Sequence, residues 1–145
     1  MEDWIRTLQR NHESPSGDSD IFHLCDVVRE VGYRIHQYLR SGHVEKVYEN
    51  ALVHRLRKQG IEVRQKEPLK VLDEDGTLLG RLEVDLMIDN RLIVEVKACR
   101  LLIDEHVAQL LGYLRACGFE HGLLINFGAQ KFQIKKYILS RERSR

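Results

Sequence analysis

The chain has 145 residues, of which 43% are hydrophobic and 31% are charged. This length and apolar content are enough for one globular domain with a buried core, and they give no indication of a second domain. The formal net charge of +1 does not by itself indicate a nucleic-acid-binding protein, although a neutral chain can still carry separate acidic and basic patches.

The sequence contains no signal for export or membrane insertion. The N-terminus carries acidic residues early and has no apolar segment of the signal-peptide kind, and no apolar run approaches the roughly 18 residues that span a membrane. The three cysteines, Cys25, Cys99 and Cys117, are far apart, lie in apolar surroundings and form no CxxC pair. These features predict reduced thiols, a cytoplasmic protein and no membrane contact.

The N-terminal part of the chain predicts an arm followed by two helices. Residues 1–19 mix Ser, Pro, Gly and acidic residues, which is typical of a flexible arm. Ser19 or Asp20 is expected to cap a helix whose apolar residues keep the helical period as far as a Ser-Gly stop signal at 41–42. A second amphipathic helix is expected to follow at once and to end at Gly60.

Alternation of apolar and polar residues begins at Ile61 and predicts strands. A first strand, interrupted by Pro68, leads through an Asp-Glu-Asp-Gly turn into a second strand at 77–87. The period of two places Val84 and Leu86 on the same face of this second strand.

The rest of the chain predicts one more helix and three further strands. A third strand at 92–98 precedes a helix that Asp104 is expected to cap and Gly118 to terminate. The almost wholly apolar run at 121–128 predicts a strand covered on both faces, and alternation at 132–139 predicts the last strand. This order of elements predicts an α/β fold with a mixed sheet of four to five strands flanked by helices.

Three of the charged residues in the hairpin at 82–98 lie among residues that should otherwise be core, namely Asp85, Glu95 and Lys97. The turn at 89–91 decides whether they meet. If the turn has an odd number of residues, Asp85 lies directly across from Glu95 on one face of the sheet. A two-residue turn would place the two carboxylates on opposite faces.

On the first alternative, the hairpin predicts metal-assisted hydrolysis of a phosphodiester. Asp85 and Glu95 offer hard oxygen ligands suited to Mg²⁺, and the backbone carbonyl of Val96 is a further ligand within reach. A bound metal polarises the phosphodiester and lowers the pKa of a bound water, and Lys97 is expected to orient that water or hold the phosphate. Spacing alone leaves open a surface hairpin in which Lys97 forms an ion pair worth roughly 0–1 kcal/mol.

Five segments, in the order GHVEKVYENAL, LEVDLMI, VEVKA, AQLLGYL and GLLINFG, resemble the GxxExxxR protein family of the PD-(D/E)XK nuclease superfamily. The resemblance extends over residues 20–139, which it identifies as a nuclease-like domain between the arm at 1–19 and a charged tail at 140–145. It implies a restriction-endonuclease-like core of helix, three strands, helix and strand, in agreement with the order of elements predicted above.

The resemblance also implies the roles of particular side chains. The implied catalytic residues are Glu45, Asp85, Glu95, Lys97, Gln109 and Tyr113. Glu45, Asp85 and Glu95, with the Val96 carbonyl, would bind Mg²⁺, with Mn²⁺ as a substitute. Without the resemblance Glu45 has a simpler explanation, since an acid in the first turn of a helix is favoured by roughly 0.3–1 kcal/mol.

The implied partner is nucleic acid, DNA in particular. By analogy with superfamily members that cut duplexes, the resemblance also implies that the chain forms a homodimer. Phosphate contacts are expected from Lys66, Arg81, Arg100, Lys131, Lys135 and Lys136, although for each residue taken alone a solvated surface charge is the favoured explanation. Two other classes of function stay open. One is a non-catalytic nucleic-acid-binding module with the same fold, and the other is a regulatory or structural partner of a larger assembly.

Overall fold

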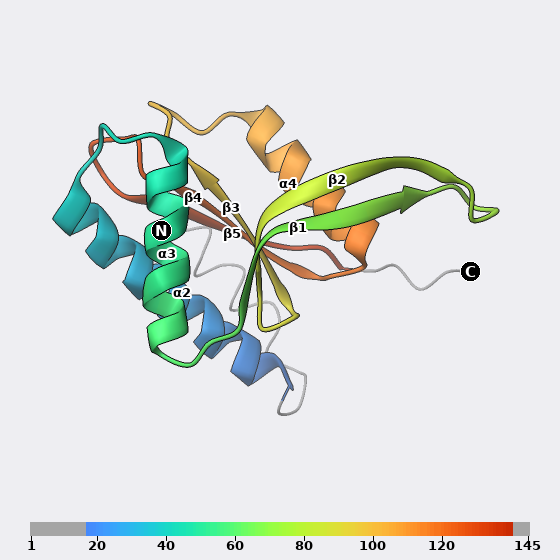
Figure 1. The fold of residues 1–145 in the computed structure, drawn as a ribbon, viewed down its shortest axis with the longest axis horizontal. Coiled ribbons are helices and arrows are strands. Elements are labelled where there is room, and N and C mark those ends of the chain that lie inside the picture. The colour runs from blue at the N-terminus through green and yellow to red at the C-terminus, as the bar shows by residue number, and fades with distance from the viewer. Residues whose placement is uncertain (1–16, 141–145) are drawn as a thin grey trace.

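The computed structural model of the chain describes residues 17–140, so most of the predicted arm and tail lie outside the described residues. Figure 1 shows the elements, and their labels are kept here. Their order is α2 (Gly17–Leu39), α3 (Glu45–Lys58), β1 (Val63–Leu72), β2 (Leu78–Ile88), β3 (Leu92–Lys97), α4 (Asp104–Cys117), β4 (His121–Asn126) and β5 (Gln133–Ile138). The order predicted from the sequence is confirmed.

The strands form one mixed sheet in the order β1-β2-β3-β4-β5, in which β3 and β4 run parallel and the other neighbours antiparallel. Helices α2 and α3 cover one face of this sheet and α4 covers the other (Figure 1). On the first face Ile35 and Leu52 are fully buried, and on the second Leu110 and Leu114 are. The predicted α/β fold with a restriction-endonuclease-like core is confirmed.

Strand β4 lies inside the sheet and is covered on both sides. Leu123 and Ile125 belong to the core beneath α2 and α3, whereas Leu124 belongs to the core beneath α4. Because its central positions meet apolar surfaces on both sides, the strand is almost wholly apolar between His121 and Asn126, as predicted. Its partner β3 is held parallel to it along its whole length.

The regular alternation of side chains between the two faces of the sheet is broken in β1 and β2, at Lys66 and Asp85. Leu86 packs with α2 and α3, but Val84 packs with α4, so the predicted common face of these two residues is wrong. Lys66 has a φ of +57° and stands opposite Asp85, because Gln65 pairs with Leu86 on one side of it. This left-handed residue bends the hairpin. The outer half of the hairpin, here called the β1–β2 arm, extends beyond the other strands (Figure 1).

The turn between β2 and β3 has the odd length that the sequence argument required. Asp89 and Asn90 have φ values of +52° and +54°, and the Arg91 N–H donates to the Ile88 carbonyl at 3.1 Å. Arg91 is therefore one extra residue after a tight left-handed turn. As a result Ile88 pairs with Leu92, which is the register that brings Asp85 across from Glu95.

Three local expectations differ from the structure. Pro68 does not interrupt β1 but lies inside it, which is tolerated because β1 is an edge strand. Helix α2 begins at Gly17, earlier than the cap predicted at Ser19 or Asp20. Asp104 is the first residue of α4 rather than its cap, and the Ile103 N–H donates instead to Nδ1 of His106 at 3.1 Å.

All three thiols are free, as predicted, with Cys25 buried and Cys99 and Cys117 half-buried. Within residues 17–140, no helix combines the length and the apolar character that crossing a membrane would need.

Candidate functional site

Strands β2 and β3 separate just beyond the Leu86–Val94 pair, and two carboxylates fill the gap. The Asp85 N–H donates to Oε1 of Glu95 at 3.0 Å, and the Val96 N–H donates to Oδ2 of Asp85 at 2.9 Å. These side chains satisfy backbone groups that would otherwise lose their ladder partners. Asp85 and Glu95 thereby lie together, 6% and 2% exposed, as the odd turn predicted.

Lys66 brings a positive charge to the same gap. Its Nζ donates to Oδ1 of Asp85 at 2.8 Å and lies 3.3 Å from Oε2 of Glu49. Burial disfavours the charge on Lys66, but the hydrogen bond and the negative charge of Asp85, together with Glu49, outweigh it and hold the pKa of this lysine above its ordinary value. Both oxygens of Asp85 are therefore engaged within the protein.

Glu49 is a buried carboxylate, 1% exposed, on the side of α3 that faces the sheet. It accepts a hydrogen bond from Nε2 of Gln65 at 3.0 Å, and Nζ of Lys46 lies 3.7 Å from it. A buried negative charge needs such partners because it has lost its water. Gln65 and Lys66 are consecutive, so Glu49 fixes the bent part of β1 beside Asp85.

A chain of hydrogen bonds joins Lys97 to helix α4. Nζ of Lys97 donates to Oε1 of Gln109 at 2.8 Å, and Nε2 of Gln109 donates to the hydroxyl of Tyr113 at 2.9 Å. Gln109 and Tyr113 are four residues apart and share one side of the helix. Burial raises the pKa of Tyr113, and the charges of Glu95 and Asp85 raise it further, so the ring lies within the field of the two carboxylates.

Glu45 begins helix α3 and is half-buried. Burial raises its pKa, and repulsion from Asp85 adds to this, while Lys97 and Lys66 act in the opposite direction. Glu45 therefore lies close enough to Asp85 for their charges to interact.

The surroundings of Glu95, a predicted metal ligand, strongly favour its protonated form. Burial raises its pKa to about 8, and the negative charge of Asp85 contributes to the rise. The hydrogen bond from the Asp85 N–H and the charge of Lys97 oppose the change without cancelling it. A cation bound at the gap would favour the ionised form of Glu95.

The end of β3 is tied to the loop that follows β4. Oδ1 of the buried Asn126 accepts from the Cys99 and Gly128 N–H groups, each at 3.0 Å, and its Nδ2 donates to the Cys99 carbonyl at 2.9 Å. A Cβ on Gly128 would lie 2.3 Å from the Cys99 nitrogen, so only glycine fits there. The Phe127 N–H donates to the Lys97 carbonyl at 2.8 Å, which fixes the backbone of Lys97.

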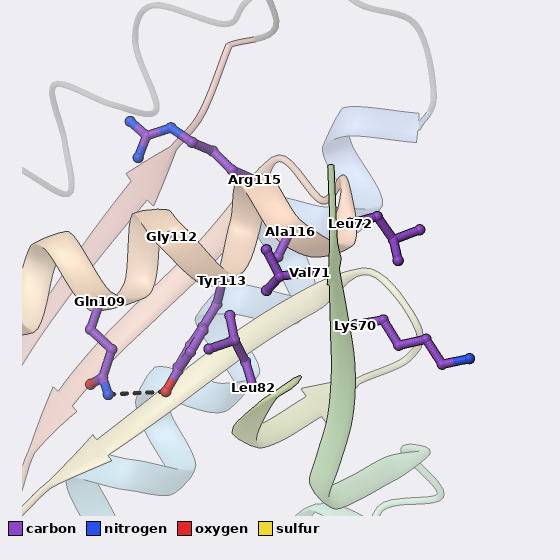
Figure 2. Close-up of a pocket in the computed structure, with 9 residues that line it drawn as sticks. All are labelled: Lys70, Val71, Leu72, Leu82, Gln109, Gly112, Tyr113, Arg115 and Ala116. Atoms are coloured by element: carbon purple, nitrogen blue, oxygen red, sulfur yellow. Dashed lines mark hydrogen bonds between the residues drawn. The ribbon is translucent and has the colours of Figure 1, made fainter. Parts of the chain in front are cut away.

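A cleft of about 610 Å³ opens beside the Gln109–Tyr113 pair, between the β1–β2 arm and α4. Figure 2 shows the ring of Tyr113 beside Leu82, with Val71 directed from the arm toward Ala116. Gly112 leaves this wall of the cleft open, since a Cβ placed on it would meet nothing within 4 Å. The predicted pair thus borders a mostly apolar surface next to the carboxylates.

The donor chemistry of the gap fits a hard divalent cation. Asp85 and Glu95 supply carboxylate oxygens, the ligands that Mg²⁺ and Mn²⁺ prefer. Asp85 already binds one cationic group, the ammonium of Lys66. Among the described residues, however, no three His, Cys, Asp or Glu side chains are arranged to hold a metal ion. Val96 was expected to bind the metal through its carbonyl, but the contact that it makes with Asp85 is through its N–H.

Hydrogen bonds join five of the six residues that the sequence singled out into two groups, Asp85 with Glu95 and Lys97 with Gln109 and Tyr113. Glu45 and the two groups interact with one another through their charges. Sequence reasoning missed Glu49 and misjudged Lys66, which contacts a carboxylate rather than standing free for phosphate. The spacing of Glu45 and Glu49, one helical turn apart, was the available signal. Lys136 was also wrong as a phosphate contact, because it is 2% exposed and bonded to His121.

Comparison with known proteins identifies a family and a similar fold. The family model described as the PD-(D/E)XK nuclease superfamily matches residues 23–137. Among solved structures, the "Crystal structure of SSO0001" is similar, with a TM-score of 0.56 and 16% sequence identity over 67% of this chain. That match covers 50% of the other protein, so the present chain spans about half its length. A comparison with curated proteins gave no match.

Proposed function

Because this chain belongs to the PD-(D/E)XK nuclease superfamily, we propose that it is a metal-dependent nuclease that hydrolyses phosphodiester bonds in nucleic acid, DNA in particular. The observation that carries this proposal is the gap between β2 and β3. There Asp85 and Glu95 lie side by side, and Lys97 is held on the same side of the sheet by Gln109.

The residues of the gap divide the proposed work among them. Asp85 and Glu95, with Glu45 and the Val96 carbonyl, would hold a divalent cation, Mg²⁺ or Mn²⁺. When bound, the cation would supply Lewis-acid activation of the phosphodiester and lower the pKa of a water molecule. Lys97 would hold the phosphate or orient the attacking water, since its ammonium is aimed by Gln109.

Gln109 and Tyr113 act through their positions. The carbonyl oxygen of Gln109 accepts a hydrogen bond from Lys97, and its amide nitrogen donates one to Tyr113. Gln109 therefore fixes the direction of the lysine side chain. Tyr113 has its hydroxyl at the edge of the apolar cleft (Figure 2). Together they form a support that keeps the ammonium near the carboxylates without adding a negative charge.

Several finer features belong to the same proposal. The ordered segments that include Glu45, Asp85 and Lys97 support membership of the narrower GxxExxxR family, with residues 20–139 as the catalytic domain. Superfamily members that cut both strands of a duplex work in pairs, which supports a homodimer by analogy. Three free thiols support a cytoplasmic location.

A non-catalytic nucleic-acid-binding or regulatory module is the second candidate, and one observation favours it. Lys66 occupies an oxygen of Asp85, and the described residues hold no arranged set of three metal ligands. In such a module the ion pair would be a structural part of the sheet, and the fold would serve binding alone.

Cleavage of end-labelled DNA separates the two candidates. The purified full chain is incubated with single-stranded, duplex, flapped and four-way substrates, with Mg²⁺, Mn²⁺ or a chelator, and binding is measured in parallel by fluorescence anisotropy. The nuclease proposal predicts cleavage of at least one substrate that needs the metal and is lost in Asp85→Ala and in Lys97→Ala. Cleavage that survives both substitutions would disprove the assigned site. Binding without cleavage of any substrate would support the module.

A further inference from the structure

A second hollow, of about 780 Å³, lies between α2 and the segment that joins β4 to β5. Its walls carry four cationic side chains and one acidic side chain: Arg29, Arg40, Lys131, Lys135 and Glu30. The acidic residue forms an ion pair with Arg34, whose Nε lies 2.9 Å from its Oε1. The hollow is therefore strongly cationic in a chain whose net charge is only +1, and it suits an anionic ligand.

Aromatic rings stand among these charges. Tyr33 lines the hollow, is 45% exposed and has its hydroxyl hydrogen-bonded to Nε2 of Gln37 at 3.2 Å. The ring of Phe132 meets it edge to face, with 6.1 Å between the centroids. An exposed ring held in place beside cations is the combination that binds a nucleobase and its phosphate.

The walls of the hollow are fixed to each other. Nε2 of the buried His36, on α2, lies 2.9 Å from the carbonyl oxygen of Ala129 on the opposite wall. Phe132 packs so closely on α2 that a Cβ on Gly32 would lie 2.9 Å from its ring. The hollow is thus a built feature of the fold and not a gap between loosely placed segments.

The hollow shares its frame with the candidate site. Tyr48 stacks on Phe127 with 4.7 Å between the ring centroids, and its hydroxyl donates to the carbonyl of Arg40, on the rim of the hollow. Phe127 in turn donates its N–H to the Lys97 carbonyl. One buried aromatic pair therefore connects the rim of the hollow, the first turns of α3 and the end of β3 that carries the candidate lysine.

We propose that this hollow, defined by Tyr33, Arg40, Lys131 and Phe132, binds a single-stranded segment of nucleic acid that extends from the candidate site. Tyr33 stacks on a base, and Arg40 and Lys131 bind backbone phosphates. The proposal rests on the nuclease function in one respect, because it identifies the bound strand as part of the substrate. A site of this kind predicts that the protein binds substrates with an unpaired stretch more tightly than blunt duplexes.

Binding is measured with the full chain in the presence of a chelator, so that no cleavage occurs. The probe is a fluorescein-labelled oligothymidylate of about 15 nucleotides, within the site sizes of single-strand binders. Tyr33→Ala is expected to weaken binding at least fivefold, and Tyr33→Phe is expected to bind nearly as well as the wild type. Tyr38→Ala is the matched control, because Tyr38 lies on the same helix, is 77% exposed and does not line the hollow.

The salt dependence of binding tests the charged part of the proposal. Lys131→Gln is expected to reduce the slope of log affinity against log salt by about 0.7, the value for one phosphate contact on a single strand. Lys131→Arg is expected to keep the wild-type slope. Equal affinities for Tyr33→Ala and Tyr38→Ala would overturn the proposal. Free thymidine monophosphate binding as tightly as the oligomer would also overturn it, since it would indicate a mononucleotide site.

The same measurements separate this proposal from the nuclease function. Oligomer binding that depends on Tyr33 but is accompanied by no cleavage of any substrate would uphold the hollow and contradict the nuclease. Cleavage that depends on Asp85 but is unaffected by Tyr33→Ala would uphold the nuclease and contradict the hollow.

Discussion

At the scale of single residues, Lys66 is the feature that most constrains metal binding. Its ammonium lies 2.8 Å from Oδ1 of Asp85, so a cation entering the gap meets a positive charge at one of its ligands. We expect Lys66→Met to raise the affinity for Mn²⁺ at least threefold, measured by isothermal titration calorimetry. Lys70→Met, an exposed lysine four residues along the same strand, is the control and should leave the affinity unchanged.

A second variant guards this prediction against misfolding. Removing Lys66 leaves the buried Glu49 with less compensation for its charge, which destabilises the folded state. Glu49→Gln combined with Lys66→Met removes that charge and keeps an acceptor for Gln65. If either folded variant binds Mn²⁺ more weakly than the wild type, Lys66 does not compete with the metal.

Glu95 predicts how stability depends on pH in the absence of metal. Its pKa is raised by burial and by Asp85, so the folded state keeps the proton while the unfolded state loses it near the ordinary value of about 4.5. Stability should therefore fall as pH rises from about 4.5 to about 8, and the loss is complete above that range. Glu95→Gln should remove this loss, which can reach about 1.4 kcal/mol for each pH unit between the two pKa values, so the variant should be the more stable protein at pH 9.

Urea unfolding with a chelator present checks that prediction. The free energy of unfolding of the wild type and of Glu95→Gln is compared at pH 4, 6 and 9, and the difference should grow with pH. A difference that is the same at all three values would mean that Glu95 ionises normally in the folded protein.

At the scale of elements, two glycines should respond oppositely to alanine. Gly112 lies in α4, where a Cβ meets nothing within 4 Å, so Gly112→Ala should stabilise the protein by about 0.5–1 kcal/mol through helix propensity. At Gly128 a Cβ would come 2.3 Å from the backbone nitrogen of Cys99. Gly128→Ala should destabilise the protein by about 1–3 kcal/mol or more and loosen the end of β3.

Thermal unfolding measures both effects, and cleavage activity adds a second readout. Gly112→Ala should remain active, since its methyl group only narrows an open cleft. Gly128→Ala should lose activity beyond what its stability explains, because the loop that it disturbs holds the Lys97 carbonyl. Similar behaviour of the two variants would contradict the close approach at Gly128.

The sequence could predict most elements because their apolar periods are local. It tied the facing of Asp85 and Glu95 to a turn of odd length but left that length open, and the structure has the odd turn. It could not predict the change of face at Val84, which arises from a left-handed φ at Lys66 in the neighbouring strand. The contacts of Glu49 likewise depend on α3 and β1 coming together, and no local pattern encodes that approach.

At the scale of the whole molecule, metal binding should be visible as stability. A ligand that binds only the folded state adds about 2.7 kcal/mol at a concentration 100 times its dissociation constant. Saturating Mn²⁺ should therefore raise the melting temperature of the wild type and leave that of Asp85→Asn nearly unchanged. An equal rise in both proteins would place the bound metal elsewhere.

The whole fold also explains how a nearly neutral chain can hold two regions of opposite charge. Acidic side chains gather in the gap between β2 and β3, whereas cationic side chains gather in the hollow beside α2. The buried Tyr48–Phe127 pair connects the two regions. Separation of charge within one frame lets a cation and a polyanion bind near each other.

The most direct test of the nuclease proposal is the rate at which the full chain cleaves its best DNA substrate in saturating Mg²⁺, measured in a single turnover for the wild type and for Asp85→Asn. Glu83→Gln, an exposed acid on the same strand, is the matched control. We predict that Asp85→Asn cleaves at least 100-fold more slowly, while Glu83→Gln cleaves within twofold of the wild type. Equal rates for Asp85→Asn and the wild type would contradict the proposed site.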